Sequence, residues 1–373
     1  MDLFDDLPEP NGAKKLPDKY PPIQTLQVPN NEGSIFDDLP PESAVAREEK
    51  IAANIDGAND RNESKRKSTD DNHEISNKEK RFRVNVCYRV KSFCASLQGE
   101  RDEMQDSHVI IDDFKPQVIR SNHDVSRLSF YAVYDGHGGK RASNYAAKHL
   151  HINLTEKFPK GDLTQLEKDM KKCMLEVYKK TDEEFLKEAA KQKPQWKDGS
   201  TATTVLLVND TLYIANIGDS TAVLCRQNDV KETIPITLTK DHSPIAYEER
   251  QRIQKAGGTV KEGRVNGILE VSRSFGDGPY KRFGVSSVPD IRRCQLTDGD
   301  RYLIIACDGL WKSFKPQEAI QFIDKIFEKG EDDESLLYST ACSQIALESV
   351  RRLSGDNVSV IIVAFTKNDN KTL

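Results

Sequence analysis

The segment Ser129-Phe-Tyr-Ala-Val-Tyr-Asp135-Gly136-His137-Gly138-Gly139 ends an apolar run on an aspartate and continues into glycine-rich sequence. A short run of aromatic and β-branched residues is typical of a strand that packs against a core. The same design occurs in Tyr302-Leu-Ile-Ile-Ala-Cys-Asp308-Gly309, and in Gly355-Asp356-Asn357 the aspartate comes just before the run Val358-Ser-Val-Ile-Ile-Val. Because strand ends are rigid supports, we expect the three aspartates to converge on one point.

Converging carboxylates predict a site for a hard cation. Oxygen ligands favour Mg²⁺ and Mn²⁺ over zinc. Gly136, directly after Asp135, would let the backbone carbonyl approach such an ion closely. One Asp-Gly pair is weak evidence for a metal site, because the chain contains six such pairs and turns account for most of them. The prediction therefore rests on the set and not on any single pair.

The remaining pattern indicates an α+β fold. β-rich runs occupy residues 128–134, 202–208, 211–217, 222–226, 301–307 and 358–365. The pair Asn209-Asp210 predicts a hairpin turn and so antiparallel pairing. Amphipathic helices are expected at 139–158, 162–190, 316–328 and 334–352, and a further helix is expected with Ser243 as N-cap, Pro244 at its first position and its end at Gly257-Gly258. Strands in hairpins and helices in separate pairs favour α+β over a parallel sheet.

Composition limits the class of protein. The 373 residues carry a net charge of −5, which argues against a nucleic-acid-binding footprint. The start MDLFDDLPEP has no features of a secretory signal, and no apolar run approaches the ~18–20 residues that span a bilayer. Seven dispersed cysteines indicate reduced thiols in a cytoplasmic or nuclear protein, with no zinc or redox site.

Residues 1–85 are polar, lack an apolar period and are expected to form a disordered tail. The segment Phe4-Asp-Asp-Leu-Pro8 recurs as Phe36-Asp-Asp-Leu-Pro40, which fits a docking motif for a partner and equally fits a composition bias. Lys65-Arg66-Lys67 and the group Lys78, Lys80 and Arg81 fit a two-part nuclear import signal or plain solubilising charge. A domain is expected at 90–366, followed by a short tail at 367–373.

An ordered series of motifs resembles that of the metal-dependent type 2C protein phosphatases. The motifs are Arg101-Asp-Glu-Met-Gln-Asp106, Asp135-Gly-His-Gly-Gly139, Asp198-Gly-Ser-Thr201, Asn216-Ile-Gly-Asp-Ser220, Val271-Ser-Arg-Ser-Phe-Gly-Asp277, Ala306-Cys-Asp-Gly-Leu-Trp311 and Gly355-Asp-Asn357. They occur in the family's order over about residues 90–366. The start Met1–Pro8 and the segments Tyr280–Gly284 and Val288–Cys294 are similar to a subgroup described as integrin-linked-kinase-associated.

The resemblance implies a four-layer α-β-β-α sandwich of two antiparallel sheets and a centre with two Mg²⁺ or Mn²⁺ ions. It implies that Asp135 bridges the ions, that the Gly136 carbonyl binds one of them, and that Asp308 and Asp356 bind the other. Asp106 and Asp219 are further candidate ligands, although Asp219 could simply cap a turn.

The resemblance also implies roles for two basic side chains. Arg101 resembles a phosphate-binding arginine, whose planar fork of donors suits two phosphate oxygens. His137 matches the proposed general acid, and neighbouring carboxylates should favour its charged form. Taken alone, Arg101 would be a surface cation and His137 a loop histidine. We expect Ser200-Thr201 and Arg273 to be structural, and Tyr280–Arg282 to be a substrate-contacting loop or a solvated turn.

Two positions depart from the family pattern. Gln105 stands where a glutamate is frequent, and an amide adds no charge, so weaker metal affinity is expected. Lys312 follows Trp311 where many relatives have an aspartate associated with a third metal site that would also use Asp219. A lysine removes that ligand and adds repulsion, so a third ion is doubtful.

Three functions fit these features. The leading one is a serine/threonine phosphatase, expected to be monomeric, that acts on phosphoproteins and has kinases as candidate partners. The second is an inactive adaptor of the same fold that binds a kinase, which the retained aspartates disfavour. The third is another metal-dependent phosphodiesterase or nuclease, which the lack of a dense basic patch disfavours. We expect no membrane and no nucleic-acid partner.

Overall fold

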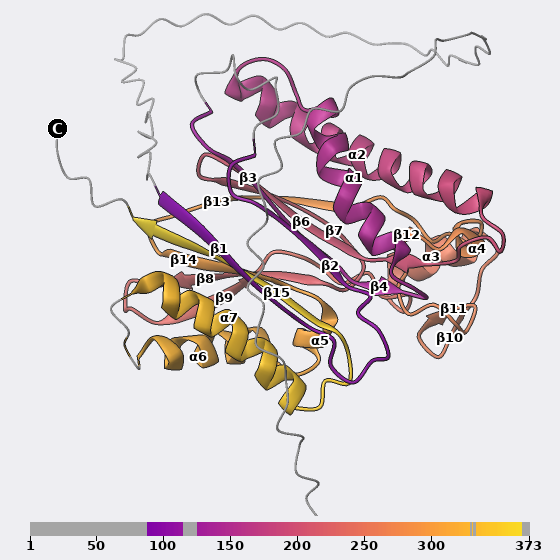
Figure 1. The fold of residues 1–373 in the computed structure, drawn as a ribbon. Coiled ribbons are helices and arrows are strands. Elements are labelled where there is room, and N and C mark those ends of the chain that lie inside the picture. The colour runs from indigo at the N-terminus through magenta and orange to yellow at the C-terminus, as the bar shows by residue number, and fades with distance from the viewer. Residues whose placement is uncertain (1–87, 115–124, 329, 331–332, 368–373) are drawn as a thin grey trace, which may run out of the picture. The chain divides into compact units, whose positions relative to one another are not determined.

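The computed structural model describes residues 88–114, 125–328, 330 and 333–367 (Figure 1). These residues all belong to the unit that begins at Asn85. The repeated FDDLP segments, the basic clusters and the C-terminal tail beyond Lys367 lie outside the described residues. None of the described helices is both long enough and apolar enough to cross a lipid bilayer.

Two five-stranded antiparallel sheets form the centre of the fold. The first has the order β1-β15-β14-β8-β9, with bounds Tyr88–Leu97, Val358–Lys367, Asp300–Ala306, Thr221–Gln227 and Thr233–Thr237. The second has the order β13-β7-β6-β3-β2, with bounds Asp290–Gln295, Thr211–Ile217, Ala202–Val208, Leu128–Tyr134 and Ser107–Ile111. Four of the eight neighbouring pairs are consecutive in the sequence, namely β2-β3, β6-β7, β8-β9 and β14-β15. The first strand, β1, pairs with the last, β15, so the two ends of the domain meet in one sheet.

The central strands are buried on both faces, because each sheet packs against its partner sheet and against helices. In β3, Tyr131 and Val133 belong to the core between the sheets, whereas Phe130 and Ala132 contact the helical layer. This alternation follows the two-residue period of a strand. Because both faces of β3 are buried, its sequence is a continuous apolar run.

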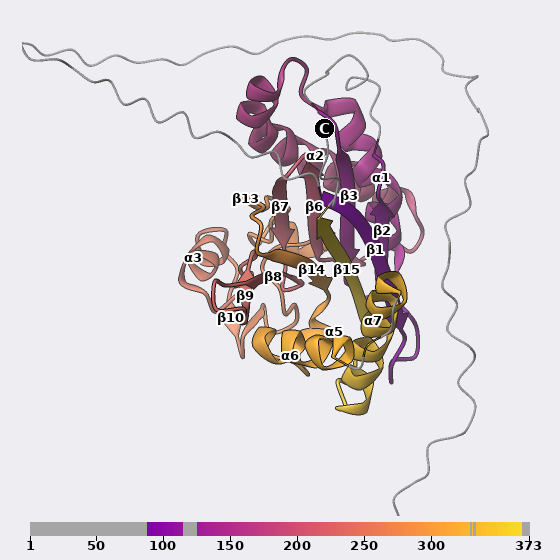
Figure 2. The same cartoon turned by 90° about the vertical axis from the view of Figure 1, so that its left-hand side faces the viewer.

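Helices cover the outer face of each sheet (Figure 2). Helices α1 (Arg141–Lys157) and α2 (Leu163–Lys191) share a core with the second sheet. Helices α6 (Pro316–Phe327) and α7 (Glu334–Arg351) share a core with the first. The result is the predicted α+β sandwich of helix, sheet, sheet and helix.

Short elements hold the loops at one end of the sandwich. The strands β4 (Gly136–His137), β5 (Gly199–Ser200) and β12 (Phe275–Gly276) form a three-stranded sheet, with β5 in the middle. The remaining elements are α3 (Tyr247–Lys255), β10 (Val260–Lys261), β11 (Arg264–Val265), α4 (Gly278–Lys281) and α5 (Asp308–Trp311).

The predicted interior strands and long helices are confirmed, with boundaries shifted by at most two residues. The hairpin turn is also confirmed, because Val208 pairs with Thr211 and Asn209 has a φ of 54°. The predicted start of α3 is wrong. This helix begins at Tyr247, and the amide of Ala246 instead donates to the carbonyl of Ser243 at 3.0 Å. Pro244 therefore occupies the second position of a turn, where its fixed φ is equally favoured.

Candidate active site

The strand registers bring the predicted aspartates to one end of the sandwich. Asp106 precedes β2 and Asp135 follows β3, and because Ser107 pairs with Tyr134 the two aspartates lie at the same end of one sheet. In the other sheet Ala306 pairs with Val360, which places Asp308 and Asp356 together. Asp219 lies in the connection from β7 to β8, where the chain crosses between the sheets.

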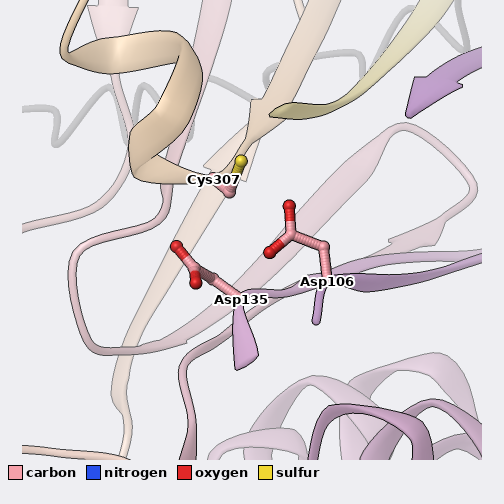
Figure 3. A group of neighbouring side chains, drawn as sticks. All are labelled: Asp106, Asp135 and Cys307. Atoms are coloured by element: carbon pink, nitrogen blue, oxygen red, sulfur yellow. The ribbon is translucent and has the colours of Figure 1, made fainter. Parts of the chain in front are cut away.

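Asp135 is common to two groups of side chains that could hold a metal ion. One carboxylate oxygen each of Asp135, Asp219 and Asp308 lies within 4.8 Å of the others. Asp106 and Cys307 form a similar group with Asp135, and Figure 3 shows these three side chains gathered at one place. Carboxylates from both sheets therefore face one small volume.

The positive charge near these carboxylates does not balance their negative charge. Burial, helped by neighbouring carboxylates, raises the pKa of Asp106 to about 6 and that of Asp219 to about 7. Burial, together with Asp106, Asp308 and Asp219, raises the pKa of Asp135 well above its ordinary value. The Oδ2 atom of Asp106 is buried and has no hydrogen-bond partner among the described residues. A divalent cation would supply this missing charge, so the donor set fits Mg²⁺ or Mn²⁺.

Asp356 contacts two basic side chains. Its Oδ2 atom lies 2.9 Å from Nη2 of Arg101 and 2.8 Å from Nζ of Lys312. Burial alone would raise the pKa of Asp356, but Lys312, the amide of Asn357 and Arg101 lower it. Lys312 also lies 2.7 Å from Oδ2 of Asp308, so this ammonium group joins Asp356 to the carboxylate cluster. The structure thus brings Arg101 to the cluster as well.

His137 pairs with a residue that had no predicted role. Its Nε2 atom lies 2.7 Å from Oδ2 of Asp277, and the hydroxyl of Ser274 donates to the same oxygen at 2.6 Å. Burial would lower the pKa of His137, but Asp277 raises it. The favoured charged form thus depends mainly on one carboxylate. The only sequence signal for Asp277 is its place at the end of the motif Val271–Asp277.

The side chain of Asn357 joins the loop of Arg101 to the aspartate strand. Its Oδ1 atom accepts from the amide of Gln105 at 2.8 Å, and its Nδ2 atom donates to the carbonyls of Gln98 and Glu103. The sequence predicted no role for this asparagine. The side chain of Gln105 donates to Glu103 at 2.8 Å.

Two glycines allow the aspartate segments to approach closely. A Cβ atom at Gly136 would lie 2.2 Å from the carbonyl oxygen of Gln105, and one at Gly309 would lie 1.9 Å from that of Asn357. Both distances are shorter than any non-bonded contact permits. The glycine after Asp135 is therefore needed for packing against the segment that carries Asp106.

Thr201 and Arg273 form structural hydrogen bonds, as predicted. The Thr201 amide donates to the carbonyl of Asp135 at 2.9 Å. Arg273 contacts Glu249 at 2.6 Å and Asp290 at 2.8 Å. These contacts fix the segments beside the site.

The chain resembles known phosphatases over most of its length. The family model for protein phosphatase 2C matches residues 90–358. The integrin-linked kinase-associated serine/threonine phosphatase 2C of Bos taurus is 48% identical over 97% of this chain and 99% of its own length.

Solved structures have the same fold. A sex-determining protein of C. elegans superposes with a TM-score of 0.61 at 26% identity, covering 74% of this chain and 64% of that one. A serine-threonine phosphatase 2C from Toxoplasma gondii superposes with a TM-score of 0.61 at 21% identity, covering 74% and 95%.

Proposed function

The chain belongs to the protein phosphatase 2C family, and on this premise we propose which of its residues carry the reaction. Its activity is that of a metal-dependent serine/threonine protein phosphatase, which hydrolyses phosphoserine and phosphothreonine in proteins. The convergence of carboxylates from both sheets on Asp135 is the observation that supports the assignment of residues.

Asp135, the Gly136 carbonyl, Asp308 and Asp356 would hold two Mg²⁺ or Mn²⁺ ions. Asp106 and Asp219 complete the acidic surroundings. When bound, the ions supply Lewis-acid chemistry, which offsets the charge of the phosphate and makes water more acidic. The carboxylates orient the attacking water on the side of the phosphate opposite the leaving oxygen.

Arg101 and His137 act on the substrate itself. The Arg101 guanidinium donates to two phosphate oxygens, and its present contact with Asp356 keeps it beside the cluster. His137 donates a proton to the leaving serine or threonine oxygen. Because Asp277 engages Nε2, the proton leaves from Nδ1. Asp277 is a positioning residue that holds the ring and favours its protonated form.

A phosphoserine peptide and an aryl phosphate, each assayed with Mn²⁺ and with EDTA, test this assignment. We expect Mn²⁺-dependent hydrolysis of both and its loss in Asp308→Asn, with the folded state retained. Turnover that survives both EDTA and Asp308→Asn would contradict the metal mechanism. A folded wild-type chain that binds a kinase without hydrolysing either substrate would favour the adaptor.

We further propose that a kinase of the integrin-linked type is a partner, since the bovine relative is described as associated with that kinase. The repeated FDDLP segments are the proposed docking elements, and Lys65–Lys67 with Lys78–Arg81 the nuclear import signal. Neutralising both basic clusters should leave a tagged chain in the cytoplasm, and an unchanged distribution would contradict the import proposal.

A further inference from the structure

Lys312 is fixed beside the carboxylate cluster by the local backbone. It follows helix α5, which begins at Asp308, and its amide donates to the Asp308 carbonyl at 2.7 Å. Residues four apart on a helical turn share one face, so the ammonium group reaches the carboxylate of the same residue. Both the backbone and the side chain of Lys312 thus contact Asp308.

The ammonium group contacts two site carboxylates at hydrogen-bond distance. Nζ lies 2.7 Å from Oδ2 of Asp308 and 2.8 Å from Oδ2 of Asp356. Among the described carboxylates, Arg101 forms an ion pair with Asp356 only, through Nη2, and its Nε donates to the Gly355 carbonyl. Lys312 is therefore the cation that joins two of the proposed metal ligands.

The contacts of Asp356 leave little room for a further cation. Its Oδ2 atom receives Lys312 and Arg101, and its Oδ1 atom accepts from the Asn357 amide at 2.8 Å. A divalent ion that binds Asp356 must displace one of these donors. Asp135, by contrast, lies in a group with Asp219 and Asp308 and in another with Asp106 and Cys307, and Lys312 contacts one member of the first group, Asp308.

We propose that Lys312 is a resident cation of the metal centre, which holds Asp308 and Asp356 together when ions are absent and competes with divalent ions for these carboxylates. This inference rests on the proposed metal-dependent function. It assigns Lys312 two opposite effects: it stabilises the ion-free protein and weakens ion binding. An ordinary surface ion pair would add a little stability and leave ion affinity unchanged.

Isothermal titration of the full chain with Mn²⁺, combined with thermal unfolding in EDTA, separates these two possibilities. Lys312→Met should bind Mn²⁺ about tenfold more tightly than wild type, since like charges near the site no longer oppose the ion. Its melting temperature in EDTA should fall, because the carboxylates lose their cation. Lys312→Arg, which keeps the charge, should stay near wild type in both measurements.

Lys315→Met is the matched control, because it removes the same charge from an exposed lysine three residues further on, at the start of α6. It should change neither measurement. If Lys312→Met does not fold, Lys312→Gln, which keeps a polar end group, takes its place in the same titration.

Equal Mn²⁺ affinity in wild type and the neutral Lys312 variants would overturn the inference while the metal mechanism stands. A wild-type chain that binds no Mn²⁺ and hydrolyses phosphopeptide in EDTA would overturn both, which keeps the two failures distinguishable.

Discussion

His137 and Asp277 are 140 positions apart in the sequence, yet Nε2 of the first lies 2.7 Å from Oδ2 of the second. The small sheet of β4, β5 and β12 makes this contact possible, because β4 carries His137 and β12 ends just before Asp277. A Cβ atom at Gly199, in the middle strand, would lie 2.1 Å from the His137 ring and 2.2 Å from the Asp277 carboxylate. The pair is thus packed directly against the backbone of β5.

If this pair delivers a proton to the leaving oxygen, its loss should matter most for poor leaving groups. We expect His137→Ala to reduce kcat on a phosphoserine peptide by about 10²–10³-fold and Asp277→Asn by about 10–100-fold. On p-nitrophenyl phosphate, whose leaving group needs no proton, both should lose only a few-fold. Steady-state kinetics on the two substrates provide the measurement, and equal losses on both would contradict the general-acid role.

The crowded carboxylates should make the ion-free protein less stable than a neutral variant. Burial, followed by neighbouring charges, raises the pKa of Asp135, so its ionised form opposes folding at neutral pH. Asp135→Asn should therefore stabilise the protein in EDTA by on the order of 1 kcal/mol and abolish the stabilisation by Mn²⁺. Thermal unfolding with and without Mn²⁺ checks both effects. Glu262→Gln, which neutralises an exposed acid, is the control and should show neither.

Glu249 should contribute a pH-dependent part of the stability. Burial alone would raise its pKa, but hydrogen bonds from Arg252, Arg273 and Ser272 lower it well below the ordinary value. The stabilisation is therefore complete above the ordinary glutamate pKa of about 4.3 and is lost as the pH falls toward the folded-state pKa. Glu249→Gln should cost about 1.5–3 kcal/mol at neutral pH, since it removes the charge from the acceptor of the hydrogen bonds from Arg252 and Arg273.

Urea unfolding of both proteins across the acidic range measures this effect. The difference in stability between wild type and Glu249→Gln should shrink as the pH falls. A difference that stays constant with pH would show that the side chain acts through packing alone.

Gly309 should be intolerant of any side chain. A Cβ atom there would lie 1.9 Å from the Asn357 carbonyl oxygen, and relief of this clash must move Asp308 away from Asp356. We expect Gly309→Ala to reduce stability by about 2–3 kcal/mol and to weaken Mn²⁺ binding. Gly278→Ala is the matched control, because its Cβ would meet only the end of the Leu186 side chain, at 3.3 Å. Similar losses in the two variants would contradict this explanation.

The proposed docking role of the FDDLP repeats can be separated from catalysis. Alanine at Phe4, Leu7, Phe36 and Leu39 should abolish binding to purified integrin-linked kinase and leave phosphopeptide turnover unchanged. Replacing only one repeat should weaken binding less, because either copy can engage the partner. Unchanged kinase binding in the fourfold variant would assign the contact to another surface.

The interior strands of this fold could be predicted from the sequence because they are apolar on both faces. β3, β6 and β7 agree with prediction at both ends. The strands β1, β2, β9 and β13 were not predicted, since they are only partly buried and their mixture of polar and apolar residues forms no continuous apolar run. Their strand state comes from pairing with a neighbour, which is a long-range property.

The parts of the site that depend on short local segments of sequence could be predicted. An aspartate at the end of a strand can be recognised from a single segment of sequence. Asp135 and Asp308 were therefore expected to lie close together, and they do. Asp356 is joined to Asp308 through Lys312, whose ammonium group contacts both carboxylates. The roles of Asp277 and Asn357 were missed, because each depends on a contact more than 100 positions away.

The carboxylates come from both sheets, and Asp219 lies where the chain passes from one to the other. Neither sheet alone presents the complete set of ligands. Catalytic competence should therefore arise only at the last step of folding, once the two halves have docked. A newly made chain would have no premature phosphatase activity, and enzyme assays would report on complete assembly more strictly than secondary structure does.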